Sequence, residues 1–199
     1  MRKILRIDPS VEIKESLQDA VDRGLAWGDF DNGLVRNGLR KMQRGLCAYC
    51  EDRLNAVDAK TRIDHFVPRS SPAGKPLVYE WTNLFLSCDC HETCDSCKKN
   101  HTDEIVNPCM DEPADCLAYL PTGSVIPVPG SNNPKGAVTI RVLNLNGGPL
   151  PIRRVREWNR HVKYWRKFSV KWSSFSADDF LRLPFGTFFV YMAKRSSNR

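Results

Sequence analysis

The sequence predicts an α+β fold in which a small zinc-bound core lies between N-terminal and C-terminal helices. Two clusters of cysteines, Cys47-x-x-Cys50 and residues 88–97, are separated by 37 residues in the middle of the chain. A short apolar segment between them stops at Pro68, which is typical of the end of a strand. Amphipathic helical patterns precede the first cluster and follow residue 150. Helices around a small metal-bound sheet satisfy all three observations.

The first 46 residues are predicted to form an N-terminal helical region. We expect one helix over 10–23, with Ser10 as its cap, and a second over 33–46, which leads the chain to Cys47. The apolar residues expected to face inward are Val11, Leu17 and Val21 in the first helix and Leu34, Leu39 and Met42 in the second.

Residues 107–150 are predicted to be an irregular connection, because 107–136 is rich in Pro, Gly and Asn. Within it, 137–145 alternates and contains β-branched residues, which favours a strand. A basic helical region is then expected over 151–199, with a helix over 153–168, a capping box at Ser176 and Asp179, and a core segment at 185–192. The 153–168 pattern turns Val155, Trp158, Val162 and Trp165 inward and leaves the rest of the surface to Arg154, Arg156, Arg160, Lys163 and Lys167.

Charge is distributed unevenly along the chain. The formal net charge is +7, yet residues 1–150 carry −2 and residues 151–199 carry +9. A basic end of this kind suits a polyanion or an acidic partner, although it also suits a solvated helical face. No apolar run approaches the ~20 residues needed to span a bilayer, and the N-terminus lacks an apolar signal core. We therefore expect a cytoplasmic protein with no membrane contact.

Eight cysteines in such a chain favour metal binding over disulfides. Zinc prefers four tetrahedral sulfur or nitrogen ligands, and a CxxC turn supplies two of them. The second cluster leaves the remaining ligands open, because five residues compete: Cys88, Cys90, His91, Cys94 and Cys97. Four cysteine ligands leave no position for a substrate, so this zinc is predicted to be structural. A redox role for the CxxC thiols fits poorly with so many neighbouring cysteines.

The segment between the clusters carries candidate catalytic residues. Asp64 and His65 lie where a strand is expected to end, so both side chains can reach one site there. Asn83 could fix the imidazole by a hydrogen bond, or simply lie in a turn. Neutral imidazole is suited to take a proton from water, and Arg69, Lys98, Lys99 and the 153–167 helix could hold phosphates.

Several stretches resemble the HNH, or ββα-metal, nuclease family. More narrowly, they resemble the PtuB-like HNH nuclease subunit of Septu-type and retron-associated antiphage defence systems. The resemblance covers roughly residues 35–160 and lies in 43–51 (QRGLCAYCE), 63–70 (IDHFVPRS), 81–84 (WTNL), and 107–108 (NP) followed by 123–127 (GSVIP). It implies a ββα-metal core over 47–106, held by a zinc site of four cysteines.

The resemblance also implies roles for individual residues. The zinc ligands would be Cys47, Cys50, Cys88 and Cys94, with Cys97 as the alternative last ligand. His65 would be the general base, Asn83 would orient it or its loop, and Asp64 and Asp95 would hold a catalytic Mg²⁺ or Mn²⁺. Five residues separate Cys88 from Cys94, where the family has two, and His91 is the rival to Asp95.

The sequence therefore predicts a metal-dependent HNH endonuclease acting on DNA, or on tRNA or other RNA. The resemblance implies a role as the effector of an antiphage system, with a PtuA-like ATPase subunit as partner and the C-terminal region as its docking surface. The alternative is a non-catalytic zinc-binding module that binds nucleic acid or protein. Asp64, His65 and Asn83 discriminate between the two, because a zinc-binding module has no need of them.

Overall fold

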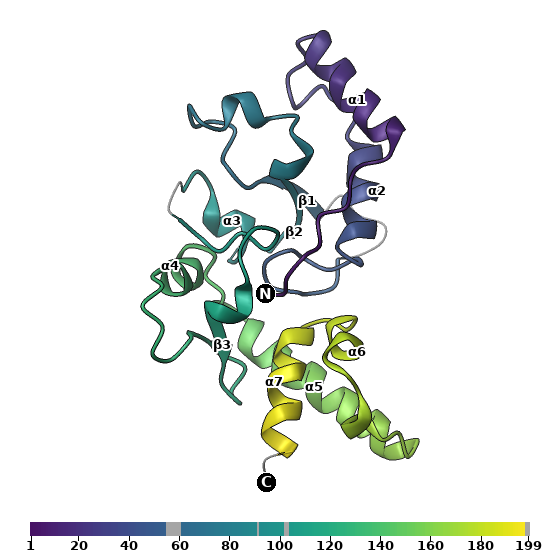
Figure 1. The fold of residues 1–199 in the computed structure, drawn as a ribbon, viewed down its shortest axis with the longest axis vertical. Coiled ribbons are helices and arrows are strands. Elements are labelled where there is room, and N and C mark those ends of the chain that lie inside the picture. Colours follow the sequence, from purple (N-terminus) through teal and green to yellow (C-terminus); the bar gives the residue numbers. More distant parts are fainter. Residues whose placement is uncertain (55–60, 91, 102–103, 198–199) are drawn as a thin grey trace.

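The computed structural model describes residues 1–54, 61–90, 92–101 and 104–197. These residues form a mixed helical fold with two small antiparallel sheets (Figure 1). The helices α1 and α2 lie at one end with the first sheet, and α5, α6 and α7 lie at the other. The short strand β3 and helix α4 lie between the two ends. None of the helices described is long and apolar enough to cross a membrane.

The two N-terminal helices are present as predicted, although the second ends at Met42 instead of residue 46, and their inward faces differ in part. Helix α1 spans Val11–Asp22 and buries Ile13, Leu17 and Ala20, and helix α2 spans Gly33–Met42 and buries Val35, Leu39 and Met42. The predictions for Val11, Val21 and Leu34 were wrong, because these side chains are at least half exposed. Leu17, Leu39 and Met42 are buried as predicted. Ile13 of α1 is also buried, because it packs against α2 at Gly38.

The first sheet is a hairpin of β1 (Thr61–His65) and β2 (Leu84–Cys88). Antiparallel register pairs Thr61 with Cys88 and His65 with Leu84, so the last residue of β1 lies opposite the first residue of β2. Short 3₁₀ turns at Lys75–Leu77 and Trp81–Asn83 lie in the connection between the strands. The four-residue helix α3, Asp95–Lys98, follows β2. The chain order is therefore strand, strand, helix.

One buried side chain joins α2 to this hairpin. Gln43 is fully buried just after α2, and its amide nitrogen donates to the carbonyls of Leu46 and Leu86, each at 2.9 Å. Its amide oxygen accepts a bond of 2.8 Å from the Leu86 backbone N–H. Ala48 also donates its backbone N–H to the Leu86 carbonyl. Gln43 and Ala48 both bond to the backbone of Leu86, so these bonds hold the Cys47–Cys50 turn against β2.

The connection 107–150 is more regular than the sequence predicts. Strands β3 (Leu117–Tyr119) and β4 (Val125–Pro127) form the second sheet, after a 3₁₀ turn at Pro113–Asp115. The strand predicted over 137–145 was wrong, because Lys135–Val142 form helix α4. Its buried residues, Gly136, Thr139 and Val142, recur every three positions and pack the helix on β4. Tertiary contact has overridden the preference of β-branched residues for strands.

The C-terminal region contains α5 (Leu150–Lys167), a 3₁₀ turn at Trp172–Ser174, α6 (Ala177–Leu181) and α7 (Gly186–Ser197). The predicted helix, capping box and core segment are all present. Trp158 and Trp165 are buried with Phe189, as predicted for the apolar face of α5.

Arg154 is the exception on α5, because it was expected on the polar surface and is only 1% exposed. Its guanidinium donates to the carbonyls of Gly123 and Leu145, each at 2.9 Å, and lies over the Tyr119 ring. These acceptors replace water, so a buried arginine can join α5 to the β3–β4 sheet.

Candidate metal centre and adjoining groove

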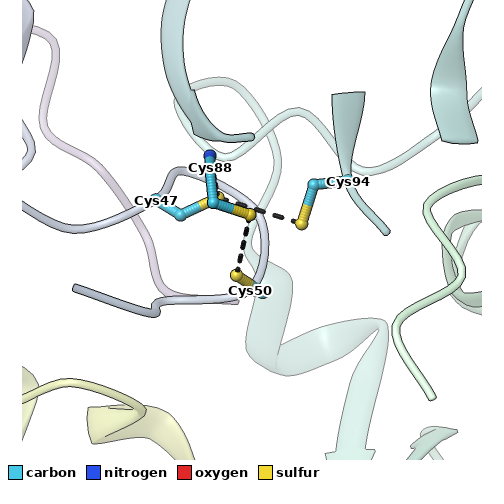
Figure 2. Close-up of side chains that lie close together, drawn as sticks. All are labelled: Cys47, Cys50, Cys88 and Cys94. Atoms are coloured by element: carbon cyan, nitrogen blue, oxygen red, sulfur yellow. Dashed lines mark hydrogen bonds between the residues drawn. The ribbon is translucent and has the colours of Figure 1, made fainter. Parts of the chain in front are cut away.

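Four cysteine sulfurs from three segments meet at the base of the hairpin. Cys47 and Cys50 come from the turn after α2, Cys88 ends β2, and Cys94 immediately precedes α3 (Figure 2). All four sulfurs lie within 4.8 Å of one another. The Cys50–Cys88 pair is 3.7 Å apart and the Cys47–Cys94 pair 3.9 Å. Tetrahedral zinc with bonds of about 2.3 Å separates its sulfurs by about 3.8 Å. The cluster therefore has the size and donor type for a metal ion such as zinc.

The surroundings of the cluster favour a cation. Burial alone would raise the pKa of the Cys47 thiol, but hydrogen bonds from Cys50, Cys88 and Cys94 hold it well below its usual range. The backbone N–H of Cys88 also donates to the Cys47 sulfur at 3.4 Å, which stabilises a thiolate. The pKa values of Cys50 and Cys94 are instead raised by hydrogen bonds to neighbouring thiols. A bound cation would relieve this competition, because metal ligation replaces the thiol protons.

The second cluster divides between the metal site and its surroundings. Cys94 is fully buried in the cluster, with a positive φ of 59° and its backbone N–H bonded to the Leu143 carbonyl. Cys90 and Cys97 are half-buried and lie outside the four-sulfur group. His91 lies outside the described residues. Among the ligands that compete in sequence, the geometry thus brings together Cys88 and Cys94.

A polar groove of about 700 Å³ adjoins this centre. Its walls include the end of β1, the start of α3, and residues that precede or follow each. The candidate catalytic residues Asp64, His65 and Asp95 all line it. β1 ends at His65, so the two neighbouring side chains reach the same groove, as expected for the end of a strand.

His65 is held in a single orientation by the connection between the strands. Its Nε2 lies 3.0 Å from the Val78 carbonyl oxygen. A carbonyl can only accept, so Nε2 carries the hydrogen and the lone pair of the neutral ring lies on Nδ1. The Trp27 ring meets the imidazole edge-on, with centroids 4.5 Å apart. Burial, together with the charges of Arg69 and Lys98, lowers the pKa of His65 to about 4. The ring is therefore neutral near pH 7.

Asp64 lies at the centre of a buried polar network. Lys98 Nζ donates to its Oδ1 at 2.9 Å and to the His65 carbonyl at 2.7 Å, and the Tyr49 hydroxyl donates to Oδ2. Burial raises the pKa of Asp64 to about 7, with Lys98 opposing the rise and the charge of Asp95 adding to it. Two carboxyl groups thus repel each other at the groove, where only one of them has a lysine partner in the described chain.

Asn83 acts on the connection between the strands instead of on the imidazole. Its Oδ1 accepts from the Val67 N–H at 2.7 Å, and its Nδ2 donates to the carbonyls of Val67 and Leu77, each at 3.1 Å. Leu77 is the neighbour of Val78, which binds the His65 ring. The sequence predicted that Asn83 orients either the His65 ring or the loop around it, and these contacts favour the loop.

The three predicted phosphate contacts are placed differently from one another. Arg69 and Lys99 are exposed and line the groove. Lys98 is 1% exposed and paired with Asp64, so its ammonium is committed to the interior. Sequence reasoning missed Trp27 and Arg36, which also line the groove. Neither belongs to the cysteine and Asp-His motifs, and only the packing of the N-terminal region against the hairpin brings them there.

These features define a protein with a four-cysteine centre that could hold a metal ion, next to a groove rich in ionisable side chains. No family model matches the chain. It resembles proteins named "Septu protein PtuB". One, from Bacillus mycoides (strain KBAB4), is 30% identical over 153 residues, covering 61% of this chain and 50% of the relative. Another, from Bacillus thuringiensis, is 30% identical over 118 residues, covering 56% of this chain and 41% of the relative. The chain thus spans half or less of the length of these relatives.

Proposed function

We propose that the chain is a metal-dependent HNH endonuclease and a component of a Septu-type antiphage defence system. One observation carries the catalytic part of the proposal: Asp64, His65 and Asp95 line a single groove beside the cysteine centre. The similarity to proteins named Septu PtuB supports the defence assignment.

The proposed HNH core consists of β1, β2 and α3. The elements follow one another in the order that the ββα-metal family requires, and the cysteine cluster joins the end of β2 to the start of α3. We assign structural zinc to Cys47, Cys50, Cys88 and Cys94, because their sulfur separations match a tetrahedral site.

In the proposed reaction, Nδ1 of His65 takes a proton from the water that attacks phosphorus. The Val78 carbonyl leaves the Nδ1 lone pair available, and burial keeps the ring neutral near pH 7. The bond between phosphorus and the leaving oxygen then breaks, and its electron pair departs with that oxygen, which takes a proton from solvent. Asn83 is a positioning residue, because it holds the loop that orients the ring.

Asp64 and Asp95 would hold the catalytic Mg²⁺ or Mn²⁺. Both ions prefer carboxylate oxygens, and the mutual repulsion of the two carboxyl groups favours a cation between them. Such an ion stabilises negative charge on the phosphate in the transition state when bound. Arg69 and Lys99, exposed at the same groove, would hold the phosphates on either side of the cleaved bond.

In this proposal the chain acts as an effector in the cytoplasm together with a PtuA-like ATPase subunit. Both relatives are named Septu protein PtuB, which supports a role in a Septu system. Because the chain matches at most half of each relative, the contact with the ATPase subunit does not follow from the similarity alone, and we propose it for this chain.

Cleavage of plasmid DNA and of tRNA with Mg²⁺ or Mn²⁺ tests the function. We expect wild-type protein to cut at least one of these substrates and His65→Ala to be inactive, while its zinc content and melting temperature stay close to those of wild type. His101→Ala removes an exposed imidazole from the same part of the sequence and should retain activity. Cleavage by folded His65→Ala would refute the role of His65. If zinc-loaded wild-type protein binds both substrates but cuts neither, the chain is the non-catalytic zinc module.

A further inference from the structure

The exposed side of α5 carries a stripe of four cations. Arg156, Arg160, Lys163 and Lys167 are all exposed. At 3.6 residues per turn they lie within about 60° of one another around the helix, over a length of about 16 Å. Buried Trp158 and Trp165 occupy the opposite side. Four of the twelve Lys and Arg residues of 151–199 thus form one line along α5.

Among the described residues, only one of these four charges has a carboxylate partner. Arg160 pairs with Glu157 on the same helix at 2.5 Å. In the part of the chain that the structure describes, no carboxylate lies within 4.0 Å of Arg156, Lys163 or Lys167. A solvated helical face usually mixes both signs of charge, whereas an uncompensated row of cations favours a polyanion.

An exposed aromatic pair lies beside the stripe. The Tyr164 and Phe168 rings are 4.7 Å apart, and each residue is 56% exposed. Lys167 Nζ lies 5.3 Å from the Phe168 ring centroid. These two exposed rings add little to the packing of the core. Aromatic faces beside cations are, however, surfaces on which nucleobases stack.

A groove of about 690 Å³ continues from the aromatic pair toward α6. Arg160 and Tyr164 line it, so each belongs to both the exposed face of α5 and the groove. Trp165 and Phe175 add apolar walls, while Arg182, which pairs with Asp178, and Asp179 add one charge of each sign. If the phosphates of a single strand bind the stripe, its unstacked bases can therefore reach the faces of these rings.

We propose that α5 and this groove form a second contact for single-stranded nucleic acid, separate from the groove at His65. The biological role of this contact rests on the proposed nuclease function, but binding at this contact requires no catalysis. A duplex would use the cations alone, because its bases are stacked inside. An acidic protein would match the charges but leave the paired rings without a stacking partner. Single strands use both features.

Fluorescence anisotropy with a labelled oligo-dT strand tests the proposal. The full-length chain is titrated without Mg²⁺, Mn²⁺ or chelator, so that zinc is kept and no strand is cut. Lys163→Gln/Lys167→Gln removes two stripe charges, and Lys14→Gln/Lys41→Gln removes two exposed charges on α1 and α2 as a matched control. We expect only the stripe variant to lower the slope of log affinity against log salt, by about 1.4 for two lost single-strand phosphate contacts. Tyr164→Ala should weaken the strand at least about fivefold, and a DNA duplex much less.

Equal losses in the two double variants would overturn the proposal, because net charge alone would then explain the binding. Equal effects of Tyr164→Ala on single strand and duplex would remove the stacking contact. If the stripe variant keeps its oligo-dT affinity but no longer binds the proposed ATPase subunit, the surface docks protein instead. Because cleavage is not measured, an inactive His65 groove leaves these results unaffected.

Discussion

Replacing Gln43 should destabilise the protein strongly, although the residue touches neither groove nor sulfur cluster. Its amide makes three buried hydrogen bonds, to Leu46 and to both polar groups of the Leu86 backbone. Gln43→Met conserves the size of the side chain but removes all three. At about 1 kcal/mol for each net bond, with an added penalty for the unpaired Leu86 N–H, we expect a loss of about 2–4 kcal/mol. The Leu86 carbonyl keeps its bond from Ala48, which limits the loss.

Urea unfolding of the zinc-loaded protein measures this loss as a lower midpoint with an unchanged slope. Gln18→Met is the matched control, because Gln18 makes one exposed hydrogen bond, to Asp22, and should change stability by less than about 0.5 kcal/mol. If Gln43→Met unfolds within about 0.5 kcal/mol of wild type, the amide does not join α2 to β2 in the way argued. A changed slope would show instead that the variant alters the unfolded or native ensemble.

Two further predictions concern the segment that links the cysteine centre to the groove. Cys94→Ser should lose bound zinc and soluble yield, whereas Cys97→Ser should keep both, as measured by zinc per chain and thermal melting; the reverse pattern would move the ligand to Cys97. Lys98→Met should destabilise the fold by about 3–5 kcal/mol in urea unfolding, because it leaves the Asp64 carboxyl buried without its cation and the His65 carbonyl without a donor. A variant as stable as wild type would show that Lys98 does not sustain this network.

Local pattern predicted most of the helices but not every face. The Trp158–Trp165 spacing specified the buried side of α5, since long apolar side chains at helical spacing have few alternatives. Arg154 lies one turn before Trp158 and follows it inward, which no hydropathy pattern predicts, because the guanidinium depends on carbonyls from distant loops. The strand predicted over 137–145 was wrong for a related reason. Its β-branched residues were weighed above the spacing of Gly136, Thr139 and Val142.

The candidate site was predictable where its residues are close in sequence. Asp64 and His65 share one strand end, and Asp95 directly follows a cysteine of the cluster. Spacing alone did not choose among the later cysteines, because five residues between Cys88 and Cys94 allow many loop conformations. The resemblance to HNH nucleases implied Cys88 and Cys94, and the structure brings these two into the cluster. Trp27 was missed altogether, since its contact with the His65 ring depends on packing between segments 38 residues apart.

The shortness of α3 explains how the cysteine centre and the groove depend on each other. Cys94 brings a sulfur to the cluster, Asp95 lines the groove, and Lys98, one turn later, returns to Asp64. A four-residue helix is too short to be stable by itself, so its position must come from contacts at its ends. Cys94 holds one end, through its sulfur and through its N–H bond to the Leu143 carbonyl, and the Lys98–Asp64 pair holds the other. Loss of the metal should therefore displace Asp95 from the groove before the hairpin itself unfolds, because Gln43 still holds β2 to the end of α2.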